Sequence, residues 1–216
     1  SHYFIFILIC FQGFIGWYMV SSGLVDRVDV SHYRLAIHLM IAFIILSLIL
    51  WNYLDLKNLV LPDKNINFNL SLFFLFLVYA QISIGAFVSG MDAGTIYNTW
   101  PLMGSTYFPD DNNINNLFTL SAFNDASLVQ FLHRNLAYLI IFFYFFIFFK
   151  IYRNHVNRLY RPINLIGFFL IIQVILGIFT LLNGAQIYLA SMHQISSIFL
   201  VSSCIYFLYL TKQVSN

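Results

Sequence analysis

The chain has 216 residues, of which 61% are hydrophobic and only 8% are charged, and its formal net charge is +2. A soluble domain would carry about 25% charged residues, so this composition excludes a soluble globular protein and indicates an integral membrane protein. The small positive excess gives no support for nucleic-acid binding, because the basic residues stand in the loops where membrane topology alone would place them.

Six apolar segments are each long enough to cross a bilayer. A helix needs roughly 20 residues to span ~30 Å of hydrocarbon at about 1.5 Å per residue. Runs such as LIIFFYFFIFFK do not alternate apolar and polar residues, which argues against the strands of a β-barrel. The predicted fold class is all-α, a polytopic membrane helical bundle with six transmembrane helices. We place these helices at residues 3–23, 34–51, 68–90, 127–149, 163–182 and 187–210.

An internal repeat runs through these helices in chain order. The first, third and fifth helices each carry Gln-x-x-x-Gly, and each is followed by a helix with a histidine near its start. A glycine four residues after the glutamine lies on the same helix face, where it allows a neighbouring helix to approach while the amide hydrogen-bonds across the contact. Packing alone explains the glycines equally well. The repeated residues are Gln12, Gly16 and His38, then Gln81, Gly85 and His133, and finally Gln173, Gly177 and His193.

The connections between the helices differ in length and charge. Residues 91–126 form a loop of about 35 residues, which is far longer than ordinary connections and favours a functional role. This loop contains four aspartates and neither lysine nor arginine. By the positive-inside rule it faces the outer side, and the three helical histidines lie in the outer half of the membrane. The basic residues that set this orientation are Lys57, Lys64, Lys150, Arg153, Arg158, Arg161 and Lys212.

The three helical histidines are the candidate functional residues. An imidazole about two turns inside a membrane helix is unfavourable unless it has a partner such as a proton relay, an ion or a metal. The alternation of long-looped and short-looped hairpins makes residues 61–216 one four-helix bundle, with His133 and His193 at equal depth. Two imidazoles on facing helices can ligate one haem iron, whereas a zinc site needs a tetrahedral ligand cluster for which the sequence gives no support.

Residues 1–60 are then expected to be the second hairpin of another four-helix bundle, of which His38 is one of two ligands. The chain starts without methionine, so we expect an N-terminally truncated fragment. Arg34, one turn from His38, and Arg134, next to His133, are candidates for binding haem propionates, with snorkelling to the interface as the alternative. The remaining histidines are expected to be solvated surface residues: His2, His32 and His155.

Several segments resemble the haem A synthase family of the mitochondrial and alphaproteobacterial type, in the right order along essentially the whole chain. The most specific is Asn98-Thr99-Trp100-Pro101-Leu102-Met103, preceded by Tyr97, which is not a generic membrane pattern. The other segments are Gly16-Trp17-Tyr18-Met19-Val20 through Ser22-Gly23-Leu24, Tyr33-Arg34-Leu35-Ala36 with His38-Leu39, Gly90-Met91-Asp92-Ala93-Gly94, Val129-Gln130-Phe131 with His133-Arg134, and Leu189-Ala190 with His193-Gln194.

This resemblance implies two tandem four-helix bundles. The C-terminal bundle would hold haem b through His133 and His193, and the N-terminal bundle would handle the substrate haem at His38, the catalytic residue. The implied reaction oxidises a methyl group of haem O to the formyl group of haem A for cytochrome oxidase. The family's other substrate-side histidine and a nearby glutamate belong to the first hairpin. This chain has no Glu, so we expect it to be inactive by itself.

The resemblance also implies where the protein acts and with what. We expect the bacterial cytoplasmic membrane, or the mitochondrial inner membrane, with the histidines toward the periplasmic or outer side. Besides haem O and membrane lipid, haem O synthase and cytochrome oxidase assembly factors are expected partners, and a homo-oligomer is left open.

Two other functions fit the residues. Bis-histidine bundles also serve as b-type cytochromes in membrane electron transfer, and by the residues alone this function is favoured. Intramembrane histidines can also form the path of a transporter. A visible spectrum separates the transporter from both haem proteins.

Overall fold

The computed structural model describes residues 2–23, 30–57 and 66–212, and the six predicted membrane helices are confirmed in them. All six are long and apolar enough to cross a membrane. Four short 3-10 helices lie between them: η1 (Ala93–Thr95), η2 (Ile114–Phe118), η3 (Leu120–Asn124) and η4 (Asn157–Leu159). The long helices are α1 (His2–Gly23), α2 (His32–Leu56), α3 (Phe68–Gly90), α4 (Ala126–Arg153), α5 (Tyr160–Leu182) and α6 (Ile187–Leu210).

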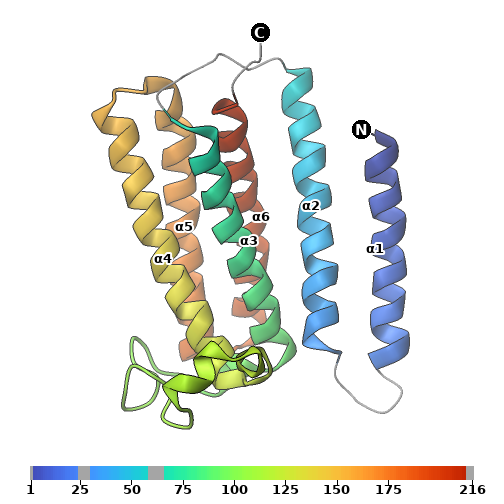
Figure 1. Ribbon diagram of the computed structural model, residues 1–216, viewed down its shortest axis with the longest axis vertical. Coiled ribbons are helices and arrows are strands. Elements are labelled where there is room, and N and C mark those ends of the chain that lie inside the picture. Colours follow the sequence, from blue (N-terminus) through green and yellow to red (C-terminus); the bar gives the residue numbers. More distant parts are fainter. Residues whose placement is uncertain (1, 24–29, 58–65, 213–216) are drawn as a thin grey trace.

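The helices lie side by side along a common axis (Figure 1). The hairpin of α5 and α6 is the most closely packed pair, α3 packs on α4, and α2 packs on both α3 and α6. Helix α1 lies at the edge of the bundle and packs mainly on α2. Residues 91–125 cover the end of the bundle at which α3 ends and α4 begins (Figure 1). We call this end the loop end.

The helices begin and end at residues that suit those positions. Asp125 caps α4 by accepting a hydrogen bond from the backbone N–H of Leu128 at 3.0 Å, which satisfies one of the free N–H groups of the first turn. Lys150 and Arg153 stand in the last turn of α4, where positive charge is favourable. Because such polar residues continue the helix beyond the hydrocarbon, α2 and α4 end several residues later than the apolar windows indicate.

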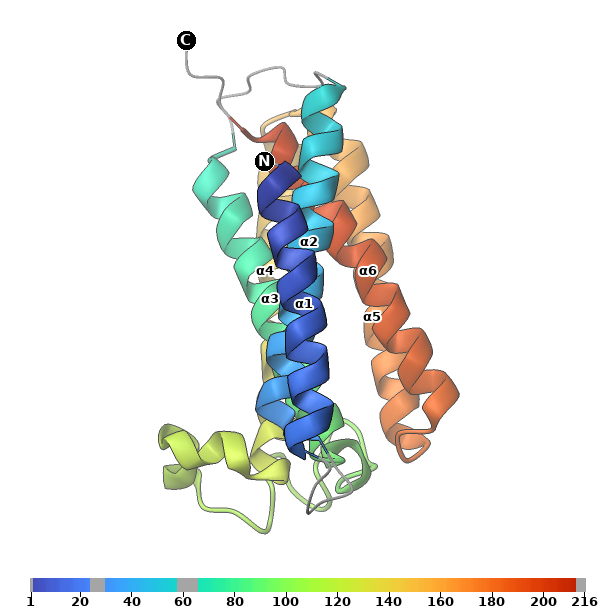
Figure 2. The same ribbon diagram turned by 90° about the vertical axis from the view of Figure 1, so that its right-hand side faces the viewer.

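Buried apolar side chains concentrate in the half of the bundle away from the loop end. Phe74 of α3, Ile151 of α4, Ile163 of α5 and Phe207 of α6 are each almost fully buried there. Toward the loop end, α5 and α6 diverge from the other helices (Figure 2). Helix association in a membrane depends on van der Waals packing and interhelical hydrogen bonds. The apolar core therefore fixes one half of the bundle, and polar contacts must define the other.

The predicted division of the chain at residues 60 and 61 lies outside the described residues, as does Lys64. The division into a hairpin and a four-helix bundle stays a prediction.

Candidate functional site

The residues of the sequence repeat come together as a Gln–Gly–His unit in each of three helix hairpins. Between α1 and α2, the Gln12 amide nitrogen donates to the backbone carbonyl of His38 at 3.0 Å and lies 3.3 Å from the ring nitrogen Nε2 of His38. A Cβ placed on Gly16 would be only 3.0 Å from Cε1 of the same ring. The glutamine thus ties down the histidine backbone, and the glycine leaves room for its imidazole.

The second unit, between α3 and α4, repeats this geometry. The Gln81 amide nitrogen donates to the His133 carbonyl at 3.0 Å and lies 3.2 Å from His133 Nε2. A Cβ on Gly85 would lie 3.1 Å from His133 Cε1.

The third unit, between α5 and α6, differs in one contact. The Gln173 amide nitrogen again donates to the histidine carbonyl, that of His193, at 3.0 Å. Its other contact is the Ser196 hydroxyl at 2.9 Å instead of the imidazole. A Cβ on Gly177 would lie 3.2 Å from His193 Cε1. The third imidazole is therefore positioned by the same glycine contact but without an amide at its ring.

All three imidazoles carry a buried ring nitrogen without a partner. The Nδ1 atoms of His38, His133 and His193 are buried and make no hydrogen bond in the described part of the chain. A buried polar atom without a partner is unfavourable. A bound group that contacts these rings would relieve that cost, as expected of a binding site.

The structure brings His133 and His193 together across the bundle. Their ring centres are 6.5 Å apart and the ring planes are inclined at 78°. Two iron–nitrogen bonds of about 2 Å, plus about 1 Å from each nitrogen to its ring centre, separate the centres of two axial imidazoles by roughly 6 Å. The pair therefore fits the axial ligands of one haem iron. Among the described residues no group of three or more His, Cys, Asp or Glu side chains could hold a metal ion.

His38 is not part of this pair. It belongs to the unit of α1 and α2, and no described histidine ring makes a ring contact with it. The guanidinium of Arg34 lies over the ring of Tyr18, 4.8 Å from its centre. Arg34 lies in the first turn of α2, the helix that also contains His38, and this places it near the loop end, as the sequence indicates.

Arg134 holds the long loop. Its Nη2 donates to the carbonyl of Tyr97 at 2.8 Å, and its Nη1 donates to the carbonyls of Thr99 and Leu102 at 2.9 and 3.2 Å. Its Nε is buried and has no partner among the described residues. The residue adjoining His133 in sequence therefore attaches the loop to α4 directly beside the histidine pair.

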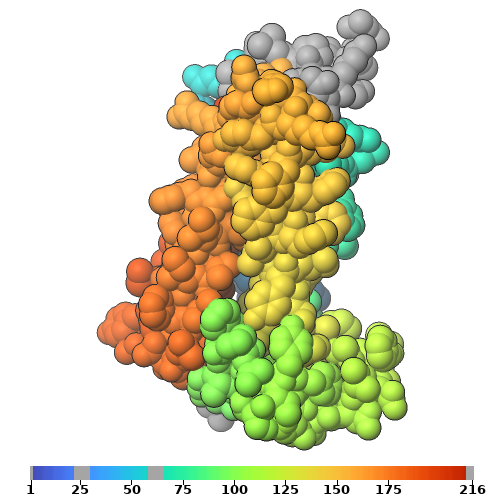
Figure 3. All heavy atoms as spheres, turned by 90° about the vertical axis from the view of Figure 1, so that its left-hand side faces the viewer, coloured from blue at the N-terminus to red at the C-terminus, as the bar shows by residue number. Residues whose placement is uncertain are grey.

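Further hydrogen bonds fasten the same loop segment to two helices. The Asn98 amide donates to the backbone carbonyl of Leu181 in α5 at 2.8 Å. The Trp100 indole N–H donates to the Tyr138 hydroxyl of α4 at 3.1 Å. The loop thus joins the loop ends of α4 and α5, which have few contacts of their own (Figure 3).

Two aspartates order the distal part of the loop. Asp110 accepts hydrogen bonds from the hydroxyls of Thr106 and Ser105, and these bonds lower its pKa. Burial raises the pKa of Asp111, but hydrogen bonds from Ser127 and Tyr97 outweigh burial, and its pKa lies below the usual value. Both carboxylates therefore stabilise the loop in their ionised form.

Sequence reasoning missed most of these loop contacts. The Gln130 amide, for example, donates to the Tyr97 carbonyl at 3.1 Å from a position that is 2% exposed. Gln130 and Asn98 stood in the family-like segments, but nothing in those segments shows that they contact backbone carbonyls. His32 was expected at the solvated surface and is instead half-buried, with ring contacts to Tyr33 and Phe87. His2 and His155 are exposed as expected.

Comparison with known proteins gives the following similarities. Residues 1–205 match the COX15-CtaA family, described as cytochrome oxidase assembly protein. The chain is 46% identical over 212 residues to the protein named Heme A synthase of Pelagibacter ubique (strain HTCC1062), an alignment that covers 98% of this chain and 62% of the relative. It is 40% identical to the Heme A synthases of Flavobacterium johnsoniae and Wolbachia pipientis wMel, covering 92% and 95% of this chain and 60% and 58% of those relatives.

The chain thus spans less than two thirds of the length of these curated relatives. No solved structure matches the chain.

Proposed function

The chain belongs to the COX15-CtaA family of cytochrome oxidase assembly proteins, and from this membership we propose that it is the larger part of a haem A synthase. The reaction is the oxidation of a methyl group of haem O to the formyl group of haem A. Relatives that are at least 40% identical carry the name Heme A synthase.

Family membership carries the choice of reaction, and the single observation in the structure that supports a haem protein is the spacing of His133 and His193. Their ring centres, 6.5 Å apart, suit the two axial ligands of a haem b iron. Each ring is positioned by its own glycine, and each backbone carbonyl is fixed by its own glutamine. Because both ligands come from rigid helices, the chain defines the site before the haem binds.

His38 is proposed to act on the substrate side. Its unit has the same build as the other two, but it lies outside the histidine pair and so remains for a second haem, haem O. We propose that its imidazole binds or positions haem O. A bound haem supplies the redox chemistry of its iron, while the helices orient the substrate methyl group and exclude water.

Arg34 and Arg134 are proposed to bind haem propionates. Arg34 lies on the same helix as His38 and toward the loop end, where a carboxylate would reach the membrane surface. The Nη atoms of Arg134 are engaged by loop carbonyls. Its buried Nε, which has no partner among the described residues, is the donor that remains for a carboxylate.

The surroundings of the protein follow from the same proposal. We place it in the bacterial cytoplasmic membrane, or in the mitochondrial inner membrane, with the loop end on the periplasmic or outer side. Haem O synthase would supply the substrate, and assembly factors of cytochrome oxidase would receive the product. Self-association is a further proposal of the same kind.

The test is made in a full-length protein that contains this chain, produced in cells that also make haem O. Extracted haems are separated by chromatography and identified by mass. We expect haem A and its hydroxylated precursor with the parent protein, and only haem O with His38→Ala. The His38→Ala protein should keep the reduced-minus-oxidised spectrum of haem b, whereas His133→Ala and His193→Ala should lose it. Absence of oxidised haem products from the parent protein would contradict the proposal.

A b-type cytochrome that only transfers electrons is the second candidate, because the spacing of His133 and His193 suits it equally. The same extraction distinguishes the two functions. A haem b spectrum without any oxidised product from haem O would favour the cytochrome. A protein without a haem spectrum would exclude both functions and favour a transporter.

A further inference from the structure

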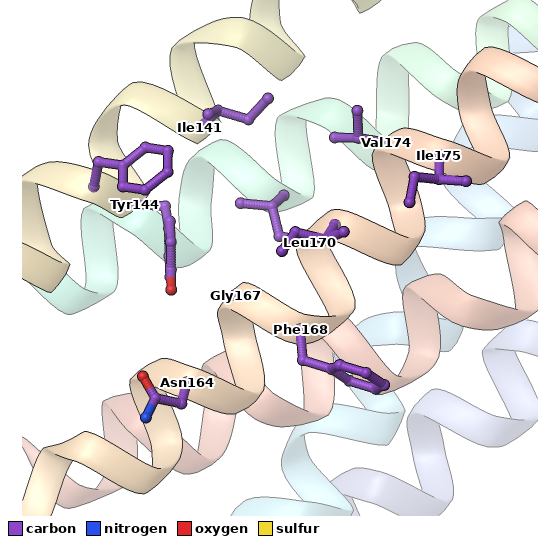
Figure 4. Close-up of a pocket in the computed structure, with 10 residues that line it drawn as sticks. Ile141, Tyr144, Asn164, Gly167, Phe168, Leu170, Val174 and Ile175 are labelled. Carbon is purple, nitrogen blue, oxygen red and sulfur yellow. The ribbon is translucent and has the colours of Figure 1, made fainter.

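A groove of about 460 Å³ runs between α4 and α5, on the side of the bundle seen in Figure 3. Apolar side chains form nearly all of its walls, and several of them face outward (Figure 4). Phe168 is 58% exposed and Ile171 is 62% exposed. In a membrane these positions face lipid, so the groove opens to the hydrocarbon.

The Tyr144 hydroxyl in this groove lacks a hydrogen-bond partner among the described residues. Tyr144 of α4 is only 9% exposed, and its hydroxyl makes no hydrogen bond with any described residue. The side chain points across the groove toward α5 at Gly167 (Figure 4). A Cβ on Gly167 would overlap this hydroxyl, so the glycine is what admits it. The hydroxyl oxygen is not fully enclosed by the helices. A donor without an acceptor is nevertheless unfavourable where it faces hydrocarbon, and a ligand with an acceptor oxygen would relieve that cost.

The depth of Tyr144 limits which acceptor can reach it. Lys150, at the end of α4 away from the loop, is six residues further along the helix, or about 9 Å at 1.5 Å per residue. The head groups and ester carbonyls of phospholipids remain near the level of such a lysine. The acceptor must therefore belong to a molecule that carries it into the hydrocarbon. No charged side chain lines the groove, so that molecule is neutral.

The two ends of the groove differ in polarity. At one end Asn164 and Tyr152 exchange hydrogen bonds of 3.0 and 3.1 Å between side chains. At the other end the walls are Val174 and Ile175, in the turn of α5 between Gln173 and Gly177 that positions His193. An elongated molecule would place its polar part near Tyr144 and its apolar part alongside this turn.

We propose that the groove binds a quinone, a neutral lipid-soluble ring with carbonyl oxygens and an apolar tail. The Tyr144 hydroxyl donates to one quinone carbonyl, and the apolar walls receive the ring and the start of the tail. This assignment goes beyond the proposed function, because it depends on the groove and not on haem binding. It places a membrane redox carrier beside α5, the helix that contributes Gln173 and Gly177 to the third Gln–Gly–His unit.

The test uses the purified membrane protein in phosphatidylcholine nanodiscs and a photoreactive azido-ubiquinone. After illumination, peptide mass mapping should locate the label on α4 and α5, and unlabelled decylubiquinone should compete for it. Tyr144→Phe should weaken this competition about three- to tenfold, the value of one hydrogen bond. Ile171→Trp, a change at an exposed wall position, should block the groove and abolish the labelling. Tyr53→Phe, at an exposed tyrosine on α2, is the matched control. It should leave both the labelling and the competition by decylubiquinone unchanged.

Three results would overturn the proposal. Label outside α4 and α5 would place the quinone elsewhere. Equal competition by decane, which has the chain but not the ring, would show a groove for acyl chains only. Unchanged competition in Tyr144→Phe would remove the hydroxyl from the site. Helical circular dichroism of each variant verifies that the bundle is folded, so loss of labelling cannot reflect unfolding.

Discussion

Each imidazole of the repeated units is held at two points by residues of the preceding helix. The glutamine fixes the backbone carbonyl of the histidine, and the glycine four residues later lies under its ring. Neither contact would suffice alone, because a fixed backbone leaves the ring free to rotate and a glycine without the amide leaves the helix free to slide. Together they orient an imidazole in the half of the bundle that the apolar core does not fix.

Gly16→Ala tests the role of the glycine within one helix. Its new Cβ would lie 3.0 Å from His38 Cε1, so the ring or the helix must shift. Misplacing a reacting group by an ångström can reduce a rate about a hundredfold. We expect haem A formation by the full-length protein to fall about tenfold or more. The control is Gly13→Ala, three residues away, where a Cβ meets nothing within 4 Å. Equal activity of the two variants would contradict this role.

The glutamines allow a second comparison. Gln81 is the side chain that holds both the His133 carbonyl and its ring nitrogen, whereas the His193 carbonyl also accepts a hydrogen bond from Ser196 at 2.9 Å. Replacing Gln81 by leucine should therefore disturb its histidine more than the same change at Gln173. Interhelical hydrogen bonds contribute about 1 kcal/mol each. We expect lower haem retention on purification and a larger change in midpoint potential for Gln81→Leu, and a reversed order would refute the difference.

The members of these units were predictable from the sequence, since Gln, Gly and His recur at fixed spacing in apolar helices. The ring distance between His133 and His193 was not, because it depends on how two hairpins pack. The contact of Gln173 with the Ser196 hydroxyl instead of an imidazole was not predictable either, because serine is common on the interior faces of membrane helices.

At the scale of elements, the long loop connects α4 to α5 through hydrogen bonds to both helices. Arg134 contributes three hydrogen bonds to loop carbonyls, and bonds from charged donors are worth about 1.5–3 kcal/mol each. Arg134→Lys keeps the charge but loses the planar fork that reaches several carbonyls at once. We expect limited proteolysis of the loop to become about tenfold faster or more. Arg153→Lys, at the other end of α4 and exposed, should leave the cleavage rate unchanged; a rise in both would indicate a general effect of charge replacement.

The loop should also respond to acid. The pKa of Asp111 is lowered in the folded protein, since hydrogen bonds outweigh burial, so its contribution is fully present above the usual value of about 4. It is lost as the pH falls through the lowered pKa. We expect hydrogen–deuterium exchange of residues 97–112, corrected for intrinsic rates, to be constant from about pH 8 to 5 and to rise only below about pH 4.

Asp111→Asn separates this carboxylate from general acid effects. The variant should exchange faster than the parent above about pH 4, because the ionised acceptor of the Tyr97 and Ser127 hydroxyls is gone, and the difference should shrink in stronger acid, where the parent carboxylate is protonated. Asp92→Asn, at an exposed aspartate of the same loop, should behave as the parent. A loop that loosens between pH 7 and 5 in the parent would contradict the direction of the shift.

The helices were predictable from the sequence, whereas the hydrogen bonds of the long loop to α4 and α5 were not. Apolar runs indicate membrane spans directly. The observed helices differ from the predicted ones only at their ends, because polar residues extend α2 and α4 beyond the hydrocarbon. The loop instead contacts α4 and α5 through its backbone carbonyls, which every residue possesses. The position of Arg134 beside His133 made it a candidate for a haem propionate or for snorkelling, but nothing in the sequence indicated that its Nη atoms contact Tyr97, Thr99 and Leu102.

At the scale of the whole molecule, charge is distributed unequally between the two ends. The connections opposite the loop end carry several lysines and arginines, and Lys212 pairs there with Asp55 at 3.3 Å. Residues 91–125 carry aspartates and no basic residue. Basic loops remain on the cytoplasmic side during insertion. The loop end, with the three histidines two turns inside it, is therefore expected on the outer side.

Cysteine labelling in intact cells tests this orientation. The parent for the test lacks its two native thiols through Cys10→Ala and Cys204→Ala, one lipid-facing and one buried. One cysteine is then introduced in the loop by Asn115→Cys, or between α4 and α5 at the other end by Asn157→Cys, both at exposed positions. A membrane-impermeant maleimide added outside should label the first variant in intact cells and the second only after lysis. The opposite pattern would put the histidines near the cytoplasmic face, and haem O would then have to enter its site from the cytoplasmic half of the bilayer.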